Sequence, residues 1–168
     1  MMHLRTHSNT LKQQVPRQPS TWSGGELIPG VGTSDLRLGC SVGEVEALLG
    51  SPDQKLEFPG QYFYVYKKIG VDVDFGRPGG PVARLFFYEK GIDGHTTRAP
   101  IEIRGLTPGT SMSVVRARLG EPARRGGPVR VGRRSEEWFY YNSGVQFDFD
   151  SHQRVITISV NTPNGEVV

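Results

Sequence analysis

Apolar and polar residues alternate in short runs along much of the chain, and glycine or glycine–proline pairs separate the runs. The runs read YFYVYKK, GVDVDF and VARLFFY in the first half of the chain and EEWFYYN, GVQFDF and RVITISVN in the second. A period of two over five to seven residues is typical of strands that bury one face. The sequence therefore predicts two sets of three or four antiparallel strands.

A short segment with helical spacing precedes the first set of strands. Ser41 is a good N-cap, and Glu44 three residues later completes a capping box with it. Gly50 suits the left-handed position after a helix, and Pro52 prevents its continuation. The apolar residues between these signals form one stripe: Val42, Val45, Leu48 and Leu49. We expect a helix of about nine residues.

The same signals recur about 70 residues later. The segment Gly39–Pro52, GCSVGEVEALLGSP, matches Gly109–Pro122, GTSMSVVRARLGEP, at seven of fourteen positions. The second copy keeps a capping Ser111 and the stop at Gly120 and lacks the acidic partner of the cap. A further match relates YVYKKIGVDVDF to WFYYNSGVQFDF at an offset of 74 residues.

A repeat with a fixed period sets the architecture before any single residue does. The predicted fold class is α+β, with two tandem repeats in which a short helical segment packs on a three- to four-stranded antiparallel sheet. We expect the sheets to form one concave face. The predicted divisions are a disordered leader at 1–25, a first repeat at 26–98 and a second repeat at 99–168.

The alternation also assigns the two faces of the strands. The side predicted to face the helices carries Phe63, Val65, Val71, Val73, Phe75, Ala83, Leu85, Phe87, Phe139, Tyr141, Val145, Phe147, Phe149, Ile156, Ile158 and Val160. The open side is predicted to bind a partner through Tyr62, Tyr64, Tyr66, Asp72, Asp74, Arg84, Phe86, Tyr88, Trp138, Tyr140 and Asp148. Aromatic residues and arginine dominate binding hot spots, although tyrosines that pair across strands also stabilise a sheet.

Composition adds limits on the class of protein. Of 168 residues, 22 are glycine and 12 are proline, which fits short strands and many turns. The N-terminus lacks a continuous apolar h-region, and Trp22 is its one residue suited to docking on the body. Cys40 is the single cysteine and excludes an internal disulfide. We expect a cytoplasmic bacterial protein with no cofactor, no bound metal and no membrane partner.

The net charge is only +3, but the basic residues are unevenly placed. A candidate basic patch in the second half contains Arg124, Arg125, Arg130, Arg133 and Arg134. Such a patch can contact nucleic acid or an acidic protein surface. A solvated helix face followed by a mobile loop explains the same pattern.

The sequence does not favour an enzyme. The four histidines, His3, His7, His95 and His152, are scattered and match no metal-ligand spacing. Asp72 and Asp74 share a strand face, where solvation or pairing with an arginine such as Arg84 is their usual state. We therefore predict no catalytic residues.

The pattern of a glycine, a capping serine, an apolar helix, Leu-Gly-x-Pro and a Trp/Tyr-x-Tyr strand resembles the SmpA/OmlA type of small lipoprotein domain. Two copies in tandem resemble the beta-lactamase inhibitor protein fold, over Leu36 to Asn161. The resemblance implies a cupped, aromatic-lined sheet that binds another protein.

The leading hypothesis is a cytoplasmic protein-binding inhibitor, an immunity protein that neutralises one cognate toxin or effector enzyme by occluding it. Two alternatives stay open. One is a nucleic-acid-binding module that uses the arginine-rich second half. The other is an assembly adaptor in which the edge of the sheet pairs with a strand of its partner.

Overall fold

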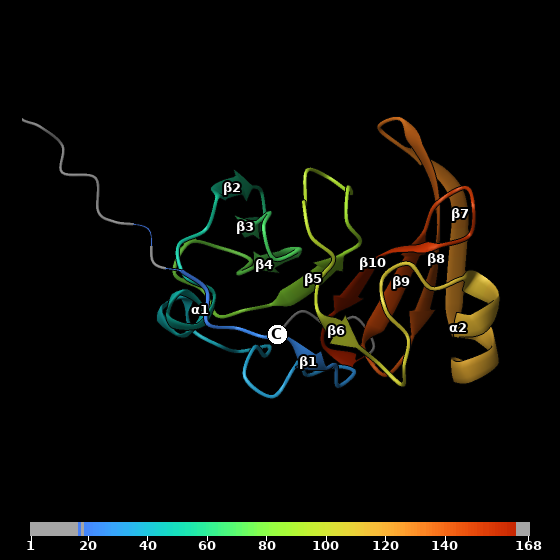
Figure 1. The fold of residues 1–168 in the computed structure, drawn as a ribbon, viewed down its shortest axis with the longest axis horizontal. Helices are drawn as coiled ribbons and strands as arrows, with labels where there is room; N and C mark the ends of the chain where they lie inside the picture. Colours follow the sequence, from blue (N-terminus) through green and yellow to red (C-terminus); the bar gives the residue numbers. More distant parts are fainter. Residues whose placement is uncertain (1–16, 18, 164–168) are drawn as a thin grey trace, which may run out of the picture.

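Eight strands form one continuous antiparallel sheet in the order β2-β3-β4-β5-β10-β9-β8-β7 (Figure 1). The computed structural model describes Arg17 and residues 19–163. The strands are β2 (Gln54–Phe58), β3 (Gln61–Tyr66), β4 (Val71–Asp74), β5 (Arg84–Tyr88), β7 (Arg124–Val131), β8 (Arg134–Tyr141), β9 (Val145–Phe149) and β10 (Val155–Val160). Each half of the sheet is therefore built from four consecutive strands, and β5 and β10 join the halves.

The predicted fold class was wrong. The chain is largely β, with one eight-stranded sheet in place of two repeat units that each carry a sheet. The described residues contain only two short helices, α1 (Val42–Leu49) and α2 (Met112–Leu119). Pairing of β5 with β10, for example Phe87 with Ile158, closes the gap that the prediction left between the two sets of strands.

All six predicted strands are present, and two further strands were missed at the edges of the sheet. β2 lies beyond β3, and β7 lies beyond β8. The alternative of a mobile loop for the arginine-rich segment was also wrong, since Arg124–Val131 is β7 and pairs with β8. This strand was not predicted because it contains Gly126, Gly127 and Pro128, and glycine and proline inside a run argue against a strand. They coincide with a register shift between Gly126 and Val129.

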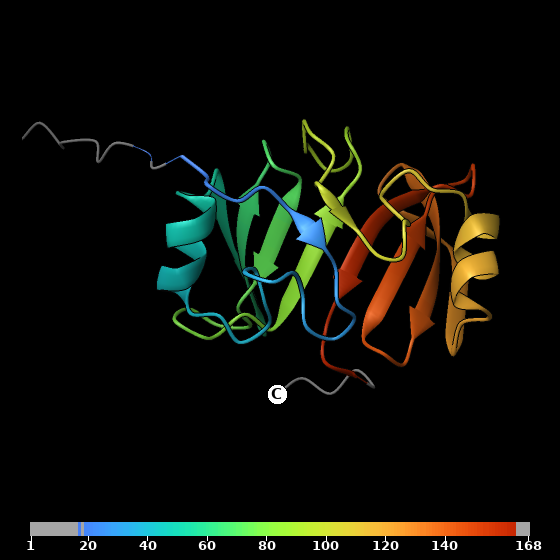
Figure 2. The same ribbon diagram turned by 60° about the horizontal axis from the view of Figure 1, so that its bottom comes forward.

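One side of the curved sheet is covered by α1, α2 and the short parallel pair β1 (Gly25–Glu26) and β6 (Ile101–Glu102) (Figures 1 and 2). Val45 and Leu49 of α1 and Met112 and Val115 of α2 belong to the same buried cluster as the inward residues of the sheet. We call the other side of the sheet the concave face. Neither helix of the described chain is long and apolar enough to cross a bilayer.

The predicted leader divides into two parts. Residues 1–16 and 18 lie outside the described residues. Trp22, by contrast, is buried, and its ring stacks on Phe87 with a centroid distance of 6.3 Å. The Thr21 amide donates to the carbonyl of Leu48, 3.0 Å away, so this segment also contacts the end of α1.

Both helices stop as predicted and start differently. Gly50 and Gly120 each follow a helix with φ of 78°, a conformation that glycine adopts without strain. The hydroxyl of Tyr66 donates to the Gly50 carbonyl at 3.1 Å, and that of Tyr141 donates to the Gly120 carbonyl at 3.0 Å. These bonds hold each helix C-terminus against its neighbouring strand.

The capping box of α1 is confirmed. The Glu44 amide donates to Ser41 Oγ at 3.2 Å, and the Ser41 amide donates to Glu44 Oε2 at 2.7 Å. Ser111 occupies the N-cap of α2, but its side chain makes no cap hydrogen bond. Its hydroxyl lies 3.2 Å from that of Ser113.

The two serines form a matched pair for a stability test. We expect Ser41→Ala to lower the free energy of unfolding by about 1 kcal/mol, because it removes a side-chain cap. Ser111→Ala is expected to lower it by only a few tenths, about what loss of a surface hydroxyl causes. Urea denaturation of both variants measures the difference, and equal losses would contradict this account of the caps.

Candidate protein-binding face

The concave face is defined by the register of the sheet. One row of directly paired residues crosses all eight strands on this face: Gln54, Val65, Asp72, Phe86, Ser159, Gln146, Tyr140 and Arg124. A second row runs through Tyr88, Thr157, Asp148, Trp138 and Gly126. Eight of the predicted partner-binding residues share this face: Asp72, Asp74, Arg84, Phe86, Tyr88, Trp138, Tyr140 and Asp148.

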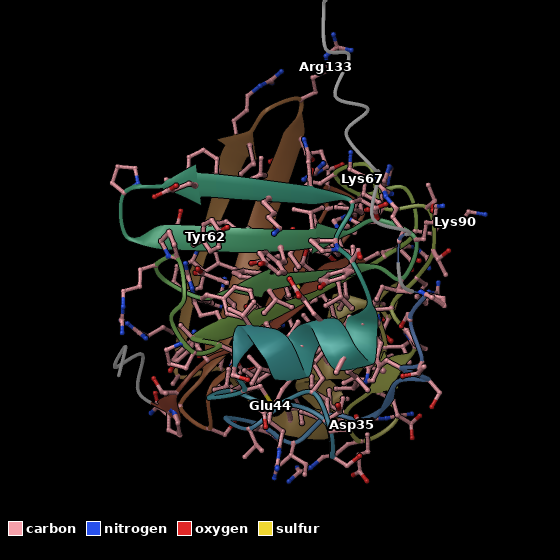
Figure 3. The ribbon with its side chains drawn as sticks, turned by 90° about the vertical axis from the view of Figure 1, so that its left-hand side faces the viewer. Asp35, Glu44, Tyr62, Lys67, Lys90 and Arg133 are labelled. Atoms are coloured by element: carbon pink, nitrogen blue, oxygen red, sulfur yellow. The ribbon has the colours of Figure 1, made fainter. Side chains whose placement is uncertain are left out.

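The three tyrosines of β3 were assigned to the wrong face. Tyr64 pairs with Val73, and Tyr66 pairs with Val71. Both tyrosines are buried in the core with α1, and Tyr62 packs against that core. Tyr62 lies at the end of the sheet opposite Lys67 (Figure 3). None of the three is therefore available on the concave face.

Turn length explains this error. Four residues, 67–70, join β3 to β4, whereas three residues, 142–144, join β8 to β9. An ungapped alignment at an offset of 74 places Tyr64 opposite Trp138, although Tyr66 and Tyr141 make the equivalent bonds to the helix ends. A slip of one residue moves every side chain of a strand to the other face.

The correction places phenylalanines on the concave face. Phe63 and Val65, predicted to face the helices, lie on this side with Phe86. Phe63 contacts both Phe58 and Phe86, with ring centroids 6.4 and 5.9 Å away. Phe58 is 51% exposed, and Phe63 and Phe86 are half-buried. We call Leu56, Phe58, Phe63 and Phe86 the aromatic rim.

Asp74 and Arg84 form an ion pair that stabilises one end of this face. Asp74 Oδ2 accepts from Arg84 Nε at 2.9 Å and from Nη2 at 2.6 Å. Asp74 Oδ1 accepts from the amides of Tyr62 and Gly76 at 3.2 and 2.8 Å. Because Asp74 is only 1% exposed and fully bonded, its role is to hold the strands. Arg84 is partly exposed, and its guanidinium lies 5.4 Å from the Phe86 ring centre.

Asp72 is bonded to a histidine that the sequence did not single out. His95 Nε2 lies 2.9 Å from Asp72 Oδ1, and His95 Nδ1 lies 2.9 Å from the carbonyl oxygen of Ile92. A carbonyl only accepts, so Nδ1 donates to Ile92, and Nε2 forms the second hydrogen bond of the ring with the Asp72 carboxyl group. The His95 ring also stacks on Tyr88 at 3.9 Å, and His95 is 1% exposed.

Tyr88 completes this cluster. Its hydroxyl donates to Asp72 Oδ2 at 3.0 Å. Burial and the Asp72 carboxylate raise the pKa of Tyr88 above its usual range, so the phenol stays protonated. The cluster pins the segment 89–100 to the sheet, at the end that carries Lys67 and Lys90 (Figure 3).

Two further ion pairs hold this segment. Arg98 donates to both carboxylate oxygens of Glu89, at 2.8 and 2.6 Å, and so joins its two ends. Arg134 of β8 donates to Asp93 Oδ1 at 3.1 Å and to Glu136 Oε1 at 3.2 Å. The segment therefore reaches across to the other half of the sheet, and Arg134 of the predicted basic patch is already paired.

One carboxyl group at the centre of the second half of the sheet ionises less readily than usual. Burial raises the pKa of Asp148 to about 6, with Glu136 adding to the rise and the Gln146 hydrogen bond of 2.9 Å opposing it. Trp138 lies beside Asp148 and packs over Gly126, where any Cβ would overlap the indole. Tyr140 is 3% exposed, and its hydroxyl has no hydrogen-bond partner within the described chain.

The described residues bring no three histidine, cysteine, aspartate or glutamate side chains together as a metal site. What the face offers is a curved surface with aromatic groups on the β2 side and arginines on the β7 side. Asp72, Asp74 and Asp148 lie between these two sides. The binding roles predicted for these residues stay predictions.

Comparison with known proteins identifies neighbours in structure alone. No family model and no curated protein matches the chain. A DUF4309 family protein, YjgB from Bacillus subtilis, aligns with a TM-score of 0.52 at 16% identity, over 79% of this chain and 88% of that chain. An extracellular protein containing an SCP domain from Bacillus anthracis aligns with a TM-score of 0.47 at 8% identity, over 74% of this chain and 44% of that chain. The likeness to YjgB is one of fold.

Asp148 generates a prediction on pH dependence. Its pKa is higher in the folded chain than the ordinary aspartate value of 3.8, so the folded state binds the proton more tightly. The contribution of Asp148 to native stability should therefore fall as pH rises from about 4 to about 6 and then level off. We expect Asp148→Asn to remove this fall and to raise the free energy of unfolding above pH 6 by about 2 kcal/mol relative to its effect at pH 4. Urea denaturation across this range measures the difference, and a pH-independent effect would contradict the assignment.

Proposed function

We propose that this chain is a protein-binding protein whose concave face holds one cognate partner. The main observation behind this proposal is the aromatic rim. Phe63 contacts both Phe58 and Phe86 on the side of the sheet away from the helices, and Phe58 keeps half of its surface exposed. Contiguous apolar surface edged by polar residues is typical of interaction sites.

The charges on this face favour a protein over a nucleic acid. Asp72 and Asp148 lie in the two rows that cross its centre, and Glu136 lies on the same side of β8. Arg134 and Arg84 beside these groups are already paired with Glu136 and Asp74, so the described centre of the face offers a phosphate backbone no free guanidinium. A polypeptide can place apolar groups on the rim and match charges separately.

The more specific form of the proposal is the inhibitor expected from the sequence, an immunity protein that occludes a toxin or effector enzyme. Its support is the resemblance stated above together with an accessible aromatic rim. Purification of the partner tests this form directly. An immunity protein must reduce the activity of its partner in stoichiometric amounts.

Site-specific photocross-linking tests the proposed face. We expect p-benzoylphenylalanine in place of Phe58 to give a discrete protein adduct in extracts of the source organism. The same probe in place of Val114, an exposed residue of α2 on the opposite side, is the matched control. Equal adducts from both positions, or none from Phe58, would contradict the proposal.

A substitution measures the contribution of the rim. Phe58→Ala removes a half-exposed ring from an edge strand and should lower the free energy of unfolding by about 1 kcal/mol or less, without unfolding the chain. We expect it to weaken binding of the captured partner by about 1–2 kcal/mol, as measured by calorimetry. Val114→Ala should leave the affinity unchanged.

A further inference from the structure

The β7–β8 hairpin carries four arginines that form no ion pair within the described chain: Arg124, Arg125, Arg130 and Arg133. All four are exposed. Arg133 lies at the outer end of the hairpin (Figure 3). Glu136, which pairs with Val129 on the concave side, is already bonded to Arg134. We call these four residues the basic rim.

Exposed apolar residues lie among these arginines. Val129 and Val131 are 48% and 44% exposed, and they pair with Glu136 and Arg134 on the concave side of β8. Arg124 lies on the same side, with its guanidinium 4.4 Å from the Tyr140 ring centre, whereas Arg125 and Arg130 alternate to the helix side of this edge strand. Arginine mixed with apolar side chains is typical of surfaces that bind proteins. The valine side chains cannot form a hydrogen bond or an ion pair with a phosphate backbone.

The hairpin is a poor site for a second copy of this chain. β7 is an edge strand, and its arginines would face one another if two copies paired there. Charges on edge strands prevent such self-association. Pro128 lacks an amide hydrogen, and the register is irregular beside it, which further limits the addition of a strand. Side-chain contacts must therefore dominate binding at this edge.

We propose that the basic rim binds an acidic, partly apolar segment of a partner polypeptide. That segment lies along the exposed edge of β7, where its carboxylates reach arginines on both sides of the strand while its apolar side chains cover Val129 and Val131 on the concave side. The inference rests on the proposed function and adds the chemistry of the partner. Planar guanidinium groups suit carboxylates, because they bind both oxygens at once.

A peptide titration with the full chain tests the proposal. The probe is a fluorescein-labelled peptide of alternating glutamate and valine, and its counterpart carries lysine in place of glutamate. We expect anisotropy to show saturable binding of the glutamate peptide alone, weakened by added salt. Arg130→Glu together with Arg133→Glu should weaken this binding by about tenfold or more.

The matched control reverses two exposed arginines elsewhere, Arg37→Glu with Arg77→Glu, and changes the net charge equally. Its affinity should stay within about twofold of the wild type. Equal losses in both double variants, or no binding of the glutamate peptide, would overturn the proposal. Tighter binding of oligothymidylate than of the peptide would overturn it in favour of nucleic acid. Cross-linking from Phe58 tests the proposed function independently of these outcomes.

Discussion

Pairing of β5 with β10 is the contact on which the rest of the structure depends. It joins two four-stranded halves through four residue pairs from Tyr88–Thr157 to Leu85–Val160, so that one buried layer extends beneath the six inner strands from β3 to β8. Neither half alone would bury much surface, since small sheets with one short helix are marginal in water. The joint sheet also sets a single register. This register places each side chain of the strands either on the core side or on the concave face.

The sequence predicted the elements better than their arrangement. Alternation located six strands, and the signals at Ser41, Gly50 and Gly120 located the helix ends, because these features depend on local chemistry. The face of β3 was predicted wrongly because the turn after β3 has one residue more than the turn after β8. The strands that join the halves, β5 and β10, were not identified because no local pattern identifies the partner of an edge strand. His95 was missed because its bond to Asp72 spans 23 residues.

The cluster of Asp72, Tyr88 and His95 shows why a concave sheet face can carry buried polar groups. His95 lies 2.9 Å from both the Asp72 carboxyl and a backbone carbonyl, and Tyr88 stacks on it while donating to the same carboxyl. Each buried polar atom of the cluster has a partner, which avoids the penalty of an unpaired group. This network holds the segment 89–100 on the sheet, so the segment is a fixed part of the fold.

These bonds also decide how the concave face is charged. Asp72 is hydrogen-bonded to His95, Asp74 is paired with Arg84, and Asp148 has a raised pKa. The carboxyl groups at the centre are thus compensated within the chain or ionise reluctantly. The basic rim has no such compensation, and its field extends into solvent on the β7 side. An approaching partner therefore meets positive charge at one edge and apolar surface at the other. This asymmetry favours a single orientation of the partner, because reversing it would place acidic groups over Phe58 and leave the arginines unpaired.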